Sequence, residues 1–230
     1  WFCEYVRKEK KEGEKEMDIR EIDQYAEEMR ILNLRVCRGG EIIVKRDWDG
    51  EIRRNQYSAS KSFTSAAVGI ACREGLLSLD EKLFVYNNAG PYLAGILVQR
   101  RAGCSLVDYL MPRLFAPLGI RRTVWEVDPQ GFTFGAGGLF LCVTELMRFG
   151  QLLLQEGMWN GKQLIPAEYV REASRIQADN GAEGYGYLFW RGPYNSFRAD
   201  GKYGQLAIVL PDKDAVIAIN AESRDAGSMT

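Results

Sequence analysis

Segments with strand character lie near both ends of the 230-residue chain, and a long helical stretch separates them. Near the start, residues 34–37 and 41–44 are rich in β-branched and apolar residues on either side of a glycine pair, which predicts a hairpin. Near the end, residues 205–210 and 215–220 flank Pro211-Asp-Lys-Asp214, which predicts a second hairpin. Hairpins require antiparallel pairing, so an α+β fold is the economical solution. We predict an antiparallel β-sheet flanked by helices, with a mostly helical inserted region.

The middle of the chain has the periodicity of helices. Apolar residues recur at helical spacing from Ser58 onward, and Gly75 stands where a C-cap belongs. The same signals predict an amphipathic helix before residue 31, a strand over residues 185–190, and further helices over residues 91–102, 105–115, 144–156 and 166–174. We predict one unit, residues 1–230, made of a sheet-forming part (31–57 and 181–230) and a mostly helical part (58–180).

Composition narrows the class of partner. The formal net charge is −1, and the basic residues are interspersed with acidic ones, so we expect no nucleic-acid partner. No apolar run approaches the roughly 20 residues that a membrane span needs. Charged residues interrupt the first apolar residues too soon for a secretory leader. We therefore expect a cytoplasmic protein, or a periplasmic or extracellular one if a leader has been removed. Five scattered cysteines without a Cys-x-x-Cys pair predict neither a disulfide framework nor a zinc site, and we expect no metal or cofactor.

The chain contains no histidine, which excludes Ser-His-Asp and Cys-His catalysis. A nucleophile must therefore find its base in lysine, tyrosine or a carboxylate. Ser58-Ala-Ser-Lys61 is the only Ser-x-x-Lys sequence, and it opens a predicted helix, in which positions i and i+3 share a face. Free N–H groups in a first turn stabilise a developing oxyanion. Lys61 can act as a base only if burial or a neighbouring cation lowers its pKa from about 10.4.

The Ser-x-x-Lys spacing alone is weak evidence, because chance supplies about 0.4 such spacings in a chain of this composition. The structural alternative is a helix start that carries an exposed lysine. Two further sequences support a catalytic interpretation. Tyr86-Asn87-Asn88 is the only Tyr-x-Asn, and it pairs a phenol able to relay a proton with an amide able to hold a carbonyl group. Asp200-Gly-Lys-Tyr-Gly204 leads into a strand, where glycine lets a ligand approach the backbone.

These motifs together resemble those of β-lactamase-related serine hydrolases, the group of class C β-lactamases, D,D-peptidases and family VIII esterases. Tyr57-Ser-Ala-Ser-Lys-Ser-Phe-Thr64 is similar to the nucleophile segment of that group. Other similar segments follow in order, over residues 114–119, 137–139, 144–150 and 157–161. The resemblance runs from about residue 31 to residue 222. It implies a β-lactamase/transpeptidase-like fold with the active site in a cleft between the sheet and the helical region.

The resemblance also implies roles for individual residues. Ser58 would be the acylated nucleophile, with Lys61 and Tyr86 as proton shuttles. Three positions would bind substrate: Asn88, Gly201 and Lys202. The Asn88 amide would orient the substrate, and the backbone N–H groups of Ser58 and Lys202 would hold the oxyanion.

The chain departs from the group at two places that matter for substrate. Ala199 occupies the position where relatives carry His or Lys, and the missing cation weakens recognition of a carboxylate; Lys202 or Arg198 is the candidate substitute. Relatives also carry several dozen residues between the equivalents of Leu83 and Tyr86, and this sequence has almost none there.

Two hypotheses follow. The first is a serine hydrolase or acyl transferase that forms an acyl-enzyme on Ser58, with a small-molecule or peptide acyl substrate. Candidate substrates are small esters, amides and β-lactam or D-Ala-type peptides, and Ala199 favours esters and amides. The alternative is a non-catalytic, penicillin-binding-like module that binds peptide or cell-wall fragments. The sequence leaves the oligomeric state open.

Overall fold

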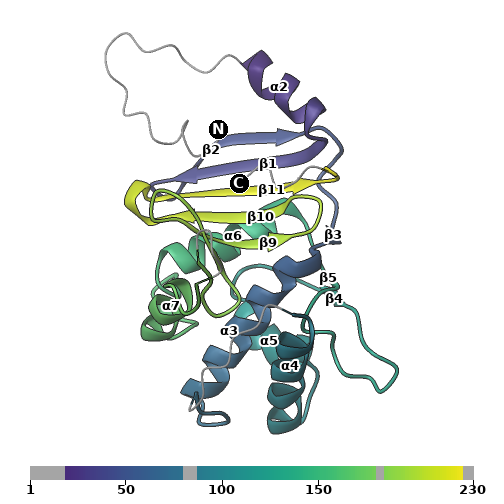
Figure 1. Ribbon diagram of the computed structural model, residues 1–230, viewed down its shortest axis with the longest axis vertical. Coiled ribbons are helices and arrows are strands. Elements are labelled where there is room, and N and C mark those ends of the chain that lie inside the picture. Colours follow the sequence, from purple (N-terminus) through teal and green to yellow (C-terminus); the bar gives the residue numbers. More distant parts are fainter. Residues whose placement is uncertain (1–18, 80–86, 180–183, 225–230) are drawn as a thin grey trace.

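A computed structural model describes residues 19–79, 87–179 and 184–224 of the chain. Its main sheet has the strand order β2-β1-β11-β10-β9-β8, and every neighbouring pair is antiparallel. The strands are β1 (Ile31–Arg38), β2 (Glu41–Asp47), β8 (Trp190–Arg191), β9 (Phe197–Gly201), β10 (Gln205–Leu210) and β11 (Ala215–Ala221). Because β1 pairs with β11, the sheet is assembled from segments near both ends of the chain (Figure 1). The predicted α+β fold with an antiparallel sheet is confirmed.

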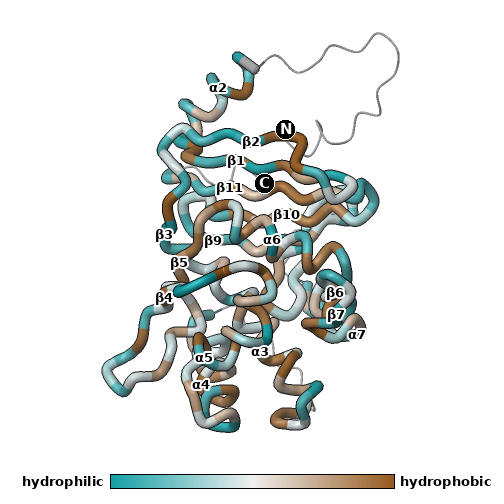
Figure 2. Tube along the Cα trace, turned by 180° about the vertical axis from the view of Figure 1, so that it is seen from behind, coloured by the Kyte–Doolittle hydropathy of each residue, from teal (hydrophilic) through white to brown (hydrophobic). Residues whose placement is uncertain are grey.

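The two predicted hairpins form the central strands and one edge of this sheet. β1 pairs with β2, and β10 pairs with β11 in a register that places Ile208 opposite Ile217. Every residue of β10 and β11 is buried, which is expected of strands covered on both faces. Figure 2 shows hydrophobic residues along these two strands.

The helices are not all on one side of the sheet: in Figure 1 the one at the start of the described chain is above it, and the others are mostly below it. They are α2 (Ile19–Glu28), α3 (Ser60–Arg73), α4 (Ala89–Ala102), α5 (Leu106–Leu110), α6 (Val143–Leu154) and α7 (Ala167–Ser174). Short turns of other helical types are η1 (Tyr57–Ala59), η2 (Met111–Phe115) and η3 (Pro211–Lys213). Small accessory sheets are formed by β3 (Arg54–Asn55), β5 (Leu139–Leu141) and β4 (Val124–Trp125), and by β6 (Met158–Trp159) with β7 (Lys162–Gln163). No helix in the described part of the chain is both long and apolar enough to cross a membrane.

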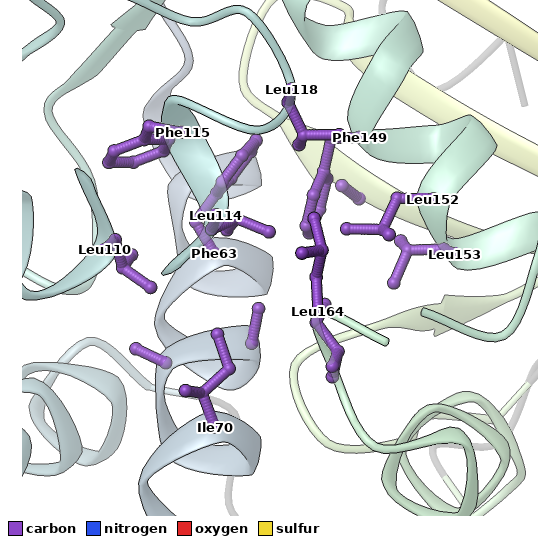
Figure 3. Close-up of a cluster of buried hydrophobic side chains, with 14 of the residues drawn as sticks. Phe63, Ile70, Leu110, Leu114, Phe115, Leu118, Phe149, Leu152, Leu153 and Leu164 are labelled. Atoms are coloured by element: carbon purple, nitrogen blue, oxygen red, sulfur yellow. The ribbon is translucent and has the colours of Figure 1, made fainter. Parts of the chain in front are cut away.

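The largest core cluster joins α3 to α6 and to the sheet. The rings of Phe63 and Phe149 are stacked with centroids 3.8 Å apart, at the centre of the cluster shown in Figure 3. α6 lies close against β11 because Gly150 has no side chain: a Cβ there would stand 2.6 Å from a methyl carbon of Val216. The cluster holds α3, which carries Lys61, in a fixed position beneath the sheet.

A second cluster covers the opposite face of the sheet. Alternate residues of β1, β10 and β11, including Leu34, Ile208 and Ile217, point to this face, as the two-residue period of a strand requires. Ile22 and Ala26 of α2 are buried in the same cluster. The helix predicted before residue 31 is therefore present from Ile19, and its apolar stripe packs against the sheet.

Three local predictions differ from the structure. Residues 185–190 do not form a strand; β8 begins only at Trp190, because Leu188 has a left-handed φ of 66° and breaks the extended backbone. The helix expected from Ser58 begins at Ser60, after the η1 turn. The helix expected from Thr144 begins at Val143, because a reciprocal capping box joins Cys142 and Glu145.

Candidate active site

Ser58 lies at the middle of the η1 turn, directly before α3, and is half-buried. The preceding residue, Tyr57, has a left-handed φ of 44°, which is costly for a bulky side chain. Its backbone N–H donates to Oδ1 of Asn55 at 2.8 Å, and this bond stabilises the turn. The sharp turn explains why the α-helix starts two residues later than the sequence pattern indicated.

Gln56 anchors the η1 turn (Tyr57–Ala59), named the nucleophile turn after the candidate nucleophile Ser58, from inside the protein. Its side chain is completely buried and donates to the carbonyl oxygens of Arg54 and Leu141, each at 3.0 Å. Its backbone N–H donates to the Leu139 carbonyl at 2.7 Å. These hydrogen bonds fasten the turn to β5 and restrict its movement.

Lys61 lies one turn after Ser58, and its Nζ donates to Ser58 Oγ at 2.8 Å. Nζ also donates to the carbonyl oxygen of Ala136 at 2.9 Å. The side chain is only 1% exposed, and burial lowers the pKa of Lys61 to about 8. About 9% of a group with that pKa is neutral at pH 7, against about 0.03% at the ordinary value. Lys61 is thus able to accept the Ser58 proton, as general base catalysis requires.

The loop that supplies the Ala136 carbonyl is itself tied to α3. Thr64 Oγ1 donates to the Gly135 carbonyl at 2.7 Å, and Leu139 N–H donates to Ser60 Oγ at 3.1 Å. A Cβ at Gly135 would stand 2.8 Å from the Pro91 carbonyl, so glycine lets this loop, α3 and α4 meet. Gly137 to Leu139 belong to a family-like segment, but the sequence did not predict Ala136 as a partner of Lys61. The run of small residues at 135–138 was the available signal.

Gly201 ends β9 in direct contact with the nucleophile turn. A Cβ at this position would lie 2.3 Å from the Gln56 carbonyl oxygen and 3.3 Å from the Ala59 nitrogen. Only glycine permits this approach, which places the backbone that continues into Lys202 beside the turn that carries Ser58. The Lys202 side chain is exposed, and its Nζ lies 4.8 Å from the ring centroid of Tyr203.

The position at which the motif resemblance leads us to expect a cation is occupied by Ala199. Ala199 is 1% exposed and belongs to the core cluster that contains Ala59. Arg198 is adjacent on the strand and therefore faces the opposite way; its Nε donates to Asp200 at 3.0 Å. Arg198 is consequently not a substitute for a cation at the position of Ala199.

Asn88 is exposed at the N-cap of α4. One turn further on, Pro91 lies against the loop that binds Lys61, so the start of α4 borders the site. Tyr86, the expected second proton shuttle, lies outside the described residues. Among the side chains that the structure describes, no group of three or more potential metal ligands is found.

Comparison with known proteins identifies the family. The sequence profile of the family described as Beta-lactamase matches residues 81–228, more than half of the chain. The chain belongs to the Beta-lactamase family. The matched range begins after Ser58 and Lys61, so the assignment of these two residues depends on their own geometry and on the motif resemblance.

Solved structures of the Beta-lactamase and penicillin-binding group have the same fold. A protein provisionally assigned as a 6-aminohexanoate-dimer hydrolase from Bacillus anthracis superposes with a TM-score of 0.79 at 16% identity, covering 88% of this chain and 76% of that one. An octameric penicillin-binding protein homologue from Pyrococcus abyssi gives 0.74 at 16% identity, covering 90% and 74%. The penicillin binding protein from Bacillus halodurans gives 0.72 at 13% identity, covering 90% and 97%. At these identities the likeness concerns the fold.

Proposed function

We propose that this protein is a serine hydrolase or acyl transferase that forms an acyl-enzyme on Ser58. The observation that carries the proposal is the buried Lys61, whose Nζ lies 2.8 Å from Ser58 Oγ and whose pKa is lowered to about 8. A structural lysine at a helix start would be solvated and would keep its charge. Membership of the Beta-lactamase family supports activity of the serine hydrolase type.

In the proposed reaction, neutral Lys61 accepts the proton of Ser58 as Oγ attacks the substrate carbonyl carbon. The backbone N–H groups of Ser58 and Lys202 hold the oxyanion, because the contact at Gly201 brings the two segments together. The leaving group departs with the proton that Lys61 returns, and water or another acceptor then releases the acyl group from Ser58. Tyr86 is the expected partner of Lys61 in these transfers, and Asn88 is expected to orient the substrate.

We expect small esters and amides to be better substrates than β-lactams. Ala199 is buried in the core cluster, and Arg198 is paired with Asp200, so neither offers a cation for a substrate carboxylate. Turnover of nitrocefin far faster than short-chain p-nitrophenyl esters would contradict this preference.

The second candidate is a binding module of the same fold that retains substrate-like ligands without turnover. The missing cation at Ala199 is the observation that favours it. The Lys61–Ser58 hydrogen bond counts against it, since a module that only binds ligand has no need of a lysine held in this state.

Intact-protein mass spectrometry after mixing with an activated ester or a penicillin tests the proposal. We expect a transient acyl adduct on the wild type and on Ser174→Ala, a matched control remote from the site, and none on Ser58→Ala. Lys61→Ala is expected to slow adduct formation by at least about 100-fold, the low end for loss of a general base. An adduct on Ser58→Ala equal to that on the wild type would refute the nucleophile assignment. If no donor gives adduct or product, the binding module becomes the better interpretation.

A further inference from the structure

A hollow of about 250 Å³ lies beside the nucleophile turn. Three segments form its wall: the residues that lead into the turn, the turn that follows Gly201, and the end of β11. Ser58 and Lys61 do not line it. Tyr57 does, and since it precedes Ser58 in the chain, the hollow begins one residue away from the nucleophile.

The charged residues in the wall of the hollow are already paired with opposite charges. Arg53 contacts Glu145 at 2.5 Å, and Arg54 contacts Asp49 at 2.6 Å. The third, Glu222, contacts Arg30 at 3.3 Å. A charged ligand would have to displace one of these partners, so the electrostatics favour a neutral occupant.

Two tyrosine rings provide the apolar part of the wall. The rings of Tyr57 and Tyr203 meet edge to face, with centroids 5.3 Å apart and planes at 80°. Tyr57 is 37% exposed, and within the described residues neither phenol makes a hydrogen bond. Lys202 lies against the Tyr203 ring. The two tyrosines therefore offer aromatic surface and two hydroxyl groups to a ligand. Such a wall suits a flat apolar group with an adjacent polar atom.

The direction of the proposed reaction indicates which part of the substrate reaches the hollow. The leaving group must receive its proton from Lys61, so it lies on the Lys61 side of the carbonyl carbon. The group attached to the other side of that carbon points away from Lys61. The hollow is lined by Tyr57 and Tyr203 and not by Lys61, so of the two groups on the carbonyl carbon the acyl substituent is the one assigned to the tyrosine pair.

We propose that this hollow is the subsite for the acyl group, and that it takes a neutral aryl or arylalkyl group, such as benzoyl or phenylacetyl, against Tyr57 and Tyr203. The inference rests on the proposed function, because it assigns the acyl side from the acylation of Ser58 and proton return by Lys61. It makes both tyrosines specificity-determining residues.

The test compares two esters with the same leaving group, p-nitrophenyl acetate and p-nitrophenyl phenylacetate. The readout is the ratio of kcat/KM for phenylacetate to that for acetate, since general damage to the site lowers both values. We expect Tyr57→Ala and Tyr203→Ala to reduce this ratio about tenfold, mainly through KM for the phenylacetate. Tyr57→Phe keeps the ring and is expected to retain the ratio. Tyr194→Ala, which removes an exposed ring outside the hollow, is the matched control. An unchanged ratio in both alanine variants would overturn the proposal.

A binding measurement separates this inference from the acyl-enzyme proposal. Phenylacetamide, a neutral amide, is titrated calorimetrically into Ser58→Ala and into the double variant with Tyr203→Ala. Binding about tenfold weaker in the double variant supports the subsite whether or not the wild type turns over esters. Two results would reject the subsite and leave the nucleophile assignment standing. One is equal binding of phenylacetamide to both proteins. The other is hydrolysis of both esters with a phenylacetate-to-acetate ratio of kcat/KM that does not depend on the tyrosines.

Discussion

The state of Lys61 can be measured before any substrate is known, through the pH dependence of stability. Lys61→Met keeps a side chain of similar length and removes the titrating group. Burial lowers the pKa of Lys61 from 10.5 to about 8 in the folded protein. Between these two values the unfolded chain binds more protons than the folded one, so the free energy of unfolding rises with pH.

The size of the effect follows from the two pKa values. A difference of about 2.5 in pKa corresponds to a penalty of about 3 kcal/mol on the wild type at and below neutral pH, where Lys61 is charged in both states. The penalty falls as pH rises past 8 and is about 1 kcal/mol at pH 10. Lys61→Met carries no such penalty. The wild type should therefore gain about 2.5 kcal/mol of stability relative to Lys61→Met between pH 7 and pH 10.

Urea unfolding of both proteins at pH 7, 8, 9 and 10 gives this difference directly. Other groups that titrate in the range cancel when the two proteins are compared. Lys45→Met, at an exposed position of β2, serves as the control, and its stability relative to the wild type should not change with pH. A wild-type minus Lys61→Met difference that is constant to within about 0.5 kcal/mol would refute the argument. A difference that moves in the opposite direction would mean that a negative partner keeps Lys61 charged.

Three further predictions concern activity and packing. With an ester substrate, kcat/KM should rise about tenfold per pH unit and level off near the Lys61 pKa of about 8, and an inflection near 6.5 instead would contradict Lys61 as the base. Gly201→Ala should reduce Ser58 acylation, measured by mass spectrometry, at least about 100-fold, because the added Cβ would stand 2.3 Å from the Gln56 carbonyl oxygen. Near-normal acylation would mean that the end of β9 and the nucleophile turn are not held in contact. Arg35 is fully buried and bonded to Asp47, so Arg35→Met should cost about 2 kcal/mol or more in urea unfolding, and an unchanged midpoint would show that the ion pair adds no net stability.

The sequence contained most of the signals for the sheet and for the Ser58–Lys61 pair. Runs of β-branched and apolar residues beside hairpin turns predicted the central strands correctly, because strands buried on both faces are apolar along their whole length. The absence of histidine directed attention to Ser58 and Lys61, and the structure places their reactive atoms 2.8 Å apart. The roles of both residues, and those of Tyr86 and Asn88, stay predictions.

Other features depended on tertiary contacts that leave no periodic signal. Residues 185–190 have strand-like composition, yet the turn conformation of Leu188 excludes a strand. The Lys61 contact with the Ala136 carbonyl joins residues far apart in the chain, and the run of small residues at 135–138 indicates a close approach without identifying the partner. Burial of Arg35 was likewise missed, because a charged residue inside a strand reads as solvent-facing until its partners are known.

The contact between Gly201 and the nucleophile turn has a consequence for when the proposed active site can assemble during synthesis. During synthesis, Ser58 and Lys61 emerge from the ribosome long before β9, β10 and β11. Until those strands are made, the N-terminal hairpin has no partner for β1, and the turn lacks the backbone that follows Gly201. Such long-range pairing forms late, since the chain between its partners must first be closed into a loop. A nascent chain that already displays Ser58 therefore lacks the proposed oxyanion site, and the proposed mechanism requires β9 and the strands that pair with it to be made first.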